Sequence, residues 1–187
     1  FRREEFTTKS QRSHKGSQRR VKLDSRLDMR TELHWVPTSL PGRLAVMPRP
    51  RGGDWLEDEV RAWKLAGVAV VVSLLEPDEA TELELDGEAA ACVANGVEFV
   101  AFPIVDRKVP KSRTDFAERV SHLVGLLQSG RTVAIHCRQG IGRAGMVAVG
   151  ILGATGVPID EAMEVVSAAR GRPVPETEAQ RQWLIEL

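Results

Sequence analysis

The segment at residues 136–145, His-Cys-Arg-Gln-Gly-Ile-Gly-Arg-Ala-Gly, constrains the fold of this chain more than any other. It follows the apolar run 132–135 and precedes a second apolar run, 146–149. This order predicts a strand, a glycine-bearing loop and a helix. Such a loop presents backbone N–H groups at a helix N-terminus, where oriented amides and the helix dipole stabilise an anion. The sequence therefore predicts an anion-binding cradle within an α/β fold.

Two side chains in this loop carry reactive chemistry. Cys137 stands at the entrance, where the field that holds an anion also favours the thiolate, the nucleophilic form of cysteine. Arg143 stands at the far end, and its planar guanidinium can curl back to bind two phosphate oxygens, which lysine does less well. A buried cysteine at a strand end followed by an ordinary helix-entry turn is the alternative. The presence of Gly140 and Gly142 between the two residues argues against it.

Residues 136–143 resemble the signature loop of the cysteine-dependent protein phosphatases, which reads His-Cys, five residues, Arg. The flanking segments are most similar to the compact dual-specificity branch of the tyrosine phosphatase superfamily, in particular to the cyclin-dependent kinase inhibitor phosphatases and their bacterial relatives. Residues 102–110 are similar to the mobile general-acid loop of that family. The resemblance extends from about residue 35 to residue 187. It implies phosphomonoester hydrolysis through a cysteinyl-phosphate intermediate, without a metal or other cofactor.

Asp106 is the candidate general acid, because the oxygen that leaves a phosphoester needs a proton and a nearby carboxylic acid is the usual donor. It lies in a short segment bracketed by Pro103 and Pro110. We expect the strand at 98–104 and the strand at 131–136 to be adjacent, parallel and joined by one helix, which would place both following loops at one sheet edge. A surface carboxylate paired with a neighbouring Arg or Lys is the alternative.

The remaining loop residues are predicted to bind phosphate through their backbone, with the side chains of Arg138 and Gln139 fanning out around the pocket mouth. The resemblance implies that His136 organises the loop and tunes the thiol, although it could be a plain strand-end histidine. Ala144 stands where the family usually has Ser or Thr, so we expect a slower breakdown of the phosphoenzyme. The predicted phosphate-binding loop comprises Arg138, Gln139, Gly140, Ile141, Gly142 and Arg143.

The segment 170–180 resembles the part of some tyrosine phosphatases that carries a glutamine for positioning the hydrolytic water. Gln180 is the candidate for this role, and a solvent-facing helix residue is the alternative. Arg170 could contact a substrate phosphate or act as a cation at a helix C-terminus.

Charged residues are distributed unevenly along the chain. The formal net charge is zero, yet residues 1–30 hold ten Lys or Arg against four Asp or Glu and almost no apolar side chains. We therefore expect residues 1–33 to be a basic, disordered N-terminal segment and residues 34–187 to be the phosphatase catalytic domain. A basic segment could contact acidic partners, and a solvated tail is the alternative. The zero net charge argues against a nucleic-acid partner.

The lengths of the apolar runs and the spacing of the cysteines indicate the cellular compartment in which we expect the protein. No run reaches the roughly 18 residues of a membrane-spanning helix, and no apolar core of signal-peptide length begins the sequence. Cys92 and Cys137 lie far apart without metal-ligand spacing, which fits a reducing compartment and predicts no metal site. We expect a cytoplasmic protein without a membrane partner, in which Cys92 packs in the core.

Strands alternate with helices and then helices follow alone, which predicts an α/β fold with a small, mostly parallel central sheet flanked by helices, as in the protein tyrosine phosphatases. A capping box at residues 54–57 is expected to open the first helix. The expected strands are one or two short ones within 35–46, followed by 68–74, 98–104 and 131–136. The expected helices are 54–66, 79–94, 114–128, 142–154, 159–169 and 177–186.

The expected substrate is phosphotyrosine and/or phosphoserine/threonine in proteins. The chain contains no Tyr to clamp a phosphotyrosine ring, which suggests a shallow pocket. A phosphoinositide or another small phosphoester is an alternative, but besides Arg143 the loop holds just one cation, unlike the lysine-rich loops of inositol-lipid phosphatases. A rhodanese-like sulfurtransferase and a non-catalytic phosphate-binding module are further alternatives.

Overall fold

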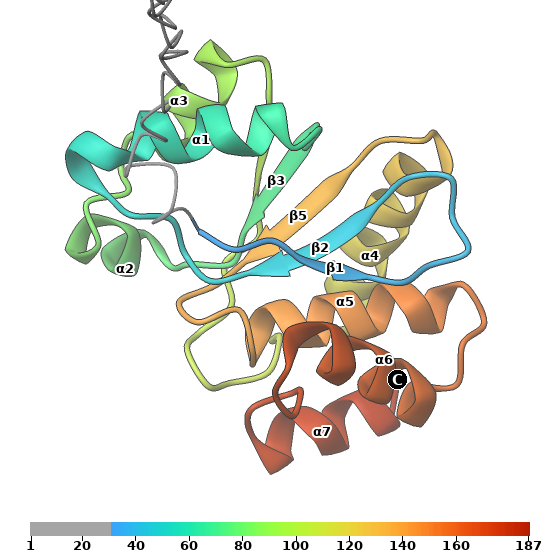
Figure 1. Ribbon diagram of the computed structural model, residues 1–187. Helices are drawn as coiled ribbons and strands as arrows, with labels where there is room; N and C mark the ends of the chain where they lie inside the picture. Colours follow the sequence, from blue (N-terminus) through green and yellow to red (C-terminus); the bar gives the residue numbers. More distant parts are fainter. Residues whose placement is uncertain (1–30) are drawn as a thin grey trace, which may run out of the picture.

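The computed structural model describes residues 31–187. Its centre is a five-stranded sheet in the order β1-β2-β5-β3-β4 (Figure 1). The edge strand β1 is antiparallel to β2, and every other pair is parallel. Apart from residues 31–33, the predicted basic segment lies outside the described residues. The strands are β1 His34–Val36, β2 Leu44–Met47, β3 Val70–Ser73, β4 Glu98–Ala101 and β5 Val133–His136.

Helices cover both faces of the sheet, as Figure 1 shows. Within residues 31–187, no helix is long and apolar enough to cross a bilayer. One face carries the short helix η1 Gly53–Trp55 with α1 Leu56–Leu65, α2 Pro77–Glu82 and α3 Glu88–Ala94, and the other carries α4 Arg113–Gln128, α5 Arg143–Ala154, α6 Ile159–Arg170 and α7 Glu178–Ile185.

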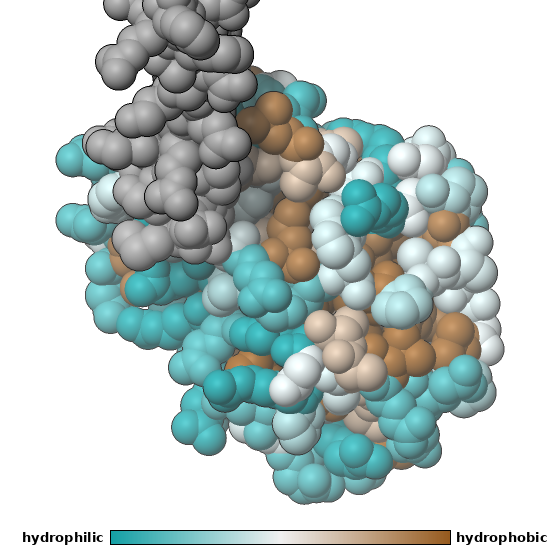
Figure 2. Space-filling view, in the orientation of Figure 1, coloured by the Kyte–Doolittle hydropathy of each residue, from teal (hydrophilic) through white to brown (hydrophobic). Residues whose placement is uncertain are grey.

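The three central strands are buried along their whole length because helices cover both of their faces. On β3, Val70 and Val72 pack toward α4 and α5, whereas Val71 between them packs toward α1 and α3. A strand buried on both faces needs an uninterrupted apolar run, and that is what the sequence has here. Apolar residues reach the visible surface in separate patches among hydrophilic ones (Figure 2). The predicted α/β architecture is confirmed.

Three local predictions were wrong. The expected helix over 79–94 is two helices, α2 and α3, because the chain turns between them with Glu84 at a φ of 56°. The expected capping box at residues 54–57 is a 3-10 turn without a side-chain cap. The capping box on this side of the sheet lies at Glu76 and Glu79, where α2 begins. Strands β4 and β5 are not adjacent, because β3 lies between them.

Candidate active site

The loop between β5 and α5 closes around the thiol of Cys137. The Cys137 residue is 3% exposed, and the backbone N–H of Gly140 donates to its Sγ at 3.2 Å. Gly140 has a φ of 67°, and a Cβ there would lie 2.4 Å from the backbone of Met47 on β2. A left-handed conformation pressed against another strand admits only glycine. The loop therefore takes the cradle shape that its glycines indicated.

Arg143, the first residue of α5, is buried and extends across the sheet edge. Its Nη1 donates to Glu79 Oε2 at 2.6 Å and to the carbonyl oxygens of Leu74 and Ile104 at 3.3 and 2.9 Å. Its Nη2 contacts Glu79 Oε1 at 3.0 Å and Asp106 Oδ1 at 2.8 Å. Its Nε donates to no group among residues 31–187. Among the described residues, Nε thus has no acceptor, while Asp106 occupies the Nη2 position beside it.

The surroundings of Arg143 keep it charged. Burial by itself would lower the pKa of Arg143, but the hydrogen bonds that it donates to Glu79 and the nearby charges of Cys137, Glu79 and Asp106 raise that pKa above its ordinary value. Burial likewise opposes ionisation of Glu79. The hydrogen bond from Arg143, the N–H of Glu76 and the charge of Arg138 nevertheless lower the pKa of Glu79. The two side chains form a forked ion pair, the geometry that best suits arginine and a carboxylate.

The sequence analysis assigned no function to Glu79, although it placed this residue within an expected helix. The available signal was local: Pro77 in the first turn of α2, with Glu79 two residues later, follows the end of β3 at the edge where α/β sites form. The capping pattern marks a helix start but does not identify the arginine that the carboxylate binds. That arginine lies 64 residues further along the chain.

Asp106 reaches the cradle from the loop after β4. Its side chain is 46% exposed and contacts Arg143 Nη2 rather than the adjacent Arg107 or Lys108. The two loops meet although β3 separates their strands, because β3, β4 and β5 are all parallel and end at the same sheet edge. The neighbouring Arg107 has a φ of 57°, an uncommon conformation for a residue with a side chain. This turn directs Asp106 and Arg107 to different partners.

A pocket of about 150 Å³ opens over the thiol. No aromatic side chain lines it, which fits the shallow mouth expected from a chain without Tyr. It brings together six of the predicted site residues with Glu176, to which the sequence analysis gave no role. The lining residues are Asp106, Arg107, Cys137, Arg138, Gln139, Gly142, Arg143 and Glu176.

Two arginines hold the loop in place, Arg138 from within it and Arg170 from α6. Arg138 lines the mouth as expected, but its Nη2 donates to Glu82 on α2 at 2.7 Å. Arg170, at the end of α6, donates to the carbonyl oxygens of Gly140 and Gln139 at 3.0 and 2.9 Å. These Arg170 donors therefore bind the loop rather than a substrate. Carbonyls held outward leave the N–H groups of the loop free to face an anion.

Gln180 does not face solvent. It is fully buried, accepts from the N–H of Thr177 at 3.3 Å and donates through Nε2 to the carbonyl oxygen of Lys108 at 3.1 Å. It therefore fastens α7 to the loop that carries Asp106. Glu176, four residues earlier, lines the pocket and lies 3.8 Å from Arg107. Both side chains approach Gly142 of the cradle, because a Cβ there would lie 3.1 Å from Gln180 Oε1 and 3.1 Å from Glu176 Oε2. The role of Gln180 in positioning the hydrolytic water stays a prediction.

The two residues that flank the loop are both buried. Ala144, in the first turn of α5, is 0% exposed and supplies no hydroxyl to the thiol. His136 is the last residue of β5, and its Nε2 lies 2.9 Å from Glu88 Oε1 on α3. Within residues 31–187, no group of three or more His, Cys, Asp or Glu is arranged to hold a metal ion.

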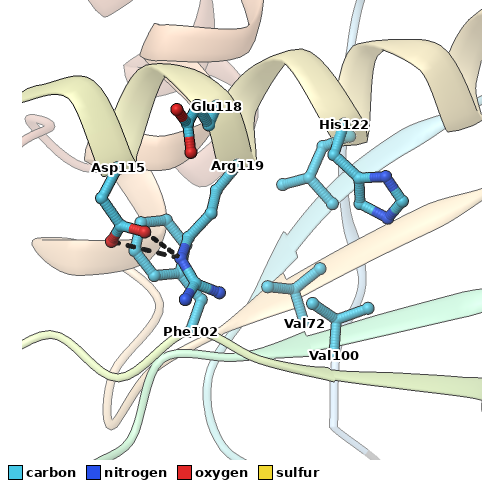
Figure 3. Close-up of a pocket in the computed structure, with 8 residues that line it drawn as sticks. Val72, Val100, Phe102, Asp115, Glu118, Arg119 and His122 are labelled. Carbon is cyan, nitrogen blue, oxygen red and sulfur yellow. Dashed lines mark hydrogen bonds and ion pairs between the residues drawn. The ribbon is translucent and has the colours of Figure 1, made fainter.

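A second cavity, of about 320 Å³, lies between α4 and the β3–β4 side of the sheet (Figure 3). Two of its charged groups bind each other: Arg119 Nε donates to both oxygens of Asp115 at 3.1 and 3.2 Å. The Arg119 guanidinium also stacks 4.8 Å from the ring centre of Phe102. This cavity contains no nucleophile, so the cradle at Cys137 is the candidate active site.

Comparison with known proteins agrees with this geometry. Residues 45–157 match the family model "Polymorphic toxin system, DSP-PTPase phosphatase". The chain belongs to this family. The match confirms the resemblance to dual-specificity and tyrosine phosphatases, and it includes both the loop that carries Asp106 and the Cys137 cradle.

Relatives of this DSP-PTPase domain include tyrosine phosphatase 197R of Invertebrate iridescent virus 6, which is 34% identical over 64 residues. That alignment spans 32% of this chain and only 24% of the viral protein. Tk-PTP in its active form is 29% identical, with a TM-score of 0.63 over 78% of this chain and 89% of that one. Kinase-associated phosphatase shares the fold at a TM-score of 0.76, with 18% identity over 83% of this chain and 93% of its own.

Proposed function

We propose that residues 34–187 form a catalytic domain that hydrolyses phosphomonoesters through a cysteinyl-phosphate on Cys137. One observation carries the proposal. Cys137 and Arg143 from the β5–α5 segment, and Asp106 from the loop after β4, line a single small pocket above a backbone cradle. A nucleophile, an anion-binding cation and a proton donor are the three groups that the reaction needs.

In the first step, Cys137 Sγ attacks phosphorus as the thiolate, and the bond from phosphorus to the leaving oxygen breaks. The loop N–H groups and Arg143 hold the equatorial oxygens, where negative charge must be stabilised. Asp106 gives its proton to the leaving oxygen. The products of this step are an alcohol and the cysteinyl-phosphate.

The contacts of Arg143 explain how Asp106 becomes available for this task. Arg143 Nη1 is committed to Glu79 and two carbonyls, so a phosphate must bind through Nε and Nη2. Binding there displaces Asp106 from Nη2, where it lies at 2.8 Å. A carboxyl group that loses a guanidinium partner and gains an anionic neighbour favours its protonated form. Substrate binding thus converts Asp106 from the partner of Arg143 into an acid.

In the second step, a water molecule attacks phosphorus, the bond from sulfur to phosphorus breaks and the thiolate returns. Asp106, now a carboxylate, accepts the proton of this water. Ala144 offers no hydroxyl to the departing sulfur, so we expect the second step to limit turnover.

We propose phosphotyrosine and/or phosphoserine/threonine in proteins as the substrate. Among the structural neighbours is PTPMT1 in complex with PI(5)P, at 20% identity and a TM-score of 0.65 over 76% of this chain. A phosphoinositide would need free cations at the pocket rim. Arg138 is already bound to Glu82, and Arg107 lies 3.8 Å from Glu176. Because the nucleophile must stay reduced, we also propose a cytoplasmic site of action.

Hydrolysis of an activated aryl phosphate tests the proposal. Wild-type protein should hydrolyse it, vanadate should inhibit, and Cys137→Ser should abolish turnover while keeping phosphate affinity. Cys92→Ser is the matched control, because the same atom is replaced at a buried cysteine of α3, away from the pocket. Appreciable hydrolysis by Cys137→Ser would refute the scheme. Sulfur transfer from thiosulfate without phosphatase activity would support the sulfurtransferase alternative.

A further inference from the structure

Asp106 lies in a tight turn of the backbone. The N–H of Lys108 donates to the carbonyl oxygen of Val105 at 3.0 Å, so Asp106 and Arg107 are the two central residues of a β-turn. Arg107, at a φ of 57°, has the left-handed conformation that a type II turn requires at this position and that glycine usually supplies. A residue with a side chain keeps such a conformation only where its surroundings hold the backbone.

Two hydrogen bonds hold the backbone on either side of this turn. Before it, the carbonyl oxygen of Ile104 accepts from Arg143 Nη1 at 2.9 Å. After it, the carbonyl oxygen of Lys108 accepts from Gln180 Nε2 at 3.1 Å. The first bond comes from the cradle, whereas the second comes from α7, a helix that contributes no residue to the lining of the pocket over Cys137.

The Gln180 amide is held in one orientation. Its Oε1 accepts from the N–H of Thr177 at 3.3 Å, and the N–H of Gln180 donates to Thr177 Oγ1 at 3.2 Å. These two bonds form the capping box at the start of α7. Because Oε1 is bound to Thr177 and the side chain is fully buried, Nε2 is left to donate to Lys108.

The helix that carries Gln180 is itself bound to the segment after the turn. Arg113, the first residue of α4, donates to the carbonyl oxygen of Trp183 at 3.1 Å and to Glu186 Oε2 at 2.8 Å. The ring of Trp183 packs edge-on against Phe116, with 4.8 Å between the ring centres. These contacts fix α7 against α4, so Gln180 donates to the turn from a fixed position.

We propose that Gln180 is a positioning residue for the general acid: through the carbonyl group of Lys108, it holds the turn that orients Asp106 toward the leaving oxygen. The inference rests on the proposed function of Asp106. Among the described residues, Arg143 is the one ion-pair partner of Asp106. When phosphate displaces Asp106 from that partner, the backbone of the turn is what still orients the carboxyl group. This role belongs to the first step, whereas positioning of the hydrolytic water belongs to the second.

The test removes the Nε2 donor in two ways. Gln180→Met keeps the length of the side chain without charge or donor, and Gln180→Glu keeps an oxygen for the N–H of Thr177 and hence the helix cap. The value of kcat/KM reports the steps as far as formation of the cysteinyl-phosphate. An alkyl leaving group needs the acid in those steps far more than an activated aryl group does. The ratio of kcat/KM for an alkyl phosphate to that for an aryl phosphate should therefore fall about 10- to 100-fold.

This ratio cancels any effect on phosphate binding that both substrates share, including repulsion by the new carboxylate of Gln180→Glu. Gln182→Met and Gln182→Glu are the matched controls, because Gln182 lies exposed on the same helix and donates to Glu186 at 2.9 Å. Their ratios should equal that of wild type. In an Asp106→Asn background the acid is already absent, so Gln180→Met should lower the ratio little further.

An unchanged ratio in folded Gln180→Met would overturn the proposal, and so would a full further loss in the Asp106→Asn background. A glutamine that acts only on the hydrolytic water would lower kcat for both substrates and leave both kcat/KM values in place. A purely structural role would lower the melting temperature and reduce both kcat/KM values in parallel. If Gln180→Met does not fold, the ratio for Gln180→Glu, which keeps the cap, decides the question.

Amide hydrogen exchange separates this inference from the proposed function, because it requires no turnover. The N–H of Lys108 closes the turn, so it should exchange at least about tenfold faster in Gln180→Met than in wild type. A wild-type protein that hydrolyses neither ester would refute the proposed function, and the exchange rate would still show whether Gln180 holds the turn. A working phosphatase with an unchanged exchange rate and an unchanged ratio would refute the inference alone.

Discussion

Replacing Glu79 by Gln removes the carboxylate that fixes the buried Arg143 while keeping the shape of the side chain. Glu79 binds Arg143 through both oxygens, at 2.6 and 3.0 Å. Breaking a buried ion pair by removing one partner costs about 3–5 kcal/mol. Asp106 remains to compensate part of the charge, so we expect the lower end, about 3 kcal/mol. For a chain of this size, that lowers the melting temperature by about 6–12 °C.

Glu82→Gln is the matched control, because Glu82 lies on the same helix and also binds an arginine of the loop. Its pair with Arg138 is exposed, at 62% and 38% of the two side chains. Exposed pairs contribute at most about 1 kcal/mol, so this variant should melt within about 4 °C of the parent.

The activity of Glu79→Gln should fall as well. With Glu79 neutral, Asp106 is the remaining carboxylate on Arg143, so phosphate displaces it less readily and the guanidinium is held less firmly. A loss of about 1.4–3 kcal/mol in the transition state corresponds to about 10- to 100-fold in kcat/KM. Steady-state hydrolysis of an aryl phosphate measures this. Equal melting temperatures and equal kcat/KM for the variants at 79 and 82 would refute the reasoning.

The stability difference should depend on pH. The pKa of Glu79 lies below its ordinary value of 4.5, against the effect of burial, because Arg143 favours the charged carboxylate. A lowered pKa gives stability that is present above the unfolded value and lost as pH falls through the folded value. The melting temperatures of wild type and Glu79→Gln should therefore differ most near neutral pH. They should converge as pH falls below 4.5.

Three further predictions concern the acid, the loop and the second step. Asp106→Asn should reduce hydrolysis of alkyl phosphates far more than of activated aryl phosphates, and equal losses would remove Asp106 from the acid role. Gly140→Ala should cost at least about 3 kcal/mol of unfolding free energy, because it adds a backbone clash to the left-handed strain. Gly130→Ala, at a φ of 81° with nothing within 4 Å, should cost only about 1–2 kcal/mol. Ala144→Ser should speed turnover after a burst of product, and unchanged turnover would contradict the assignment of the slow step.

Local signals made the cradle predictable. The strand, loop and helix around Cys137 follow from two apolar runs and from the loop glycines, of which Gly140 has a left-handed conformation that other residues adopt only at a cost. The position of Asp106 was predicted through a weaker rule. The expected adjacency of β4 and β5 was wrong, yet the loops meet because parallel strands end at one edge whichever strand lies between them.

The partners of these residues could not be predicted, because each lies far along the chain. Glu79 and Glu88 were placed in one expected helix, in which neither has a partner. The break at Glu84 gives α2 and α3 separate orientations, so that Glu79 reaches Arg143 while Glu88 reaches His136. A left-handed residue that is not glycine leaves little trace in a sequence.

The exposure of each carboxylate around the cradle indicates which role it can have. An anion site lined by Glu79, Asp106 and Glu176 repels phosphate unless the acids are held by cations or can move away. Glu79 is 12% exposed and doubly bonded to Arg143, so it stays and fixes the guanidinium. Asp106 is 46% exposed and contacts Arg143 through one oxygen, so less holds it in place. In the proposed reaction, the acid that gives way to phosphate is therefore the same one that serves as the proton donor.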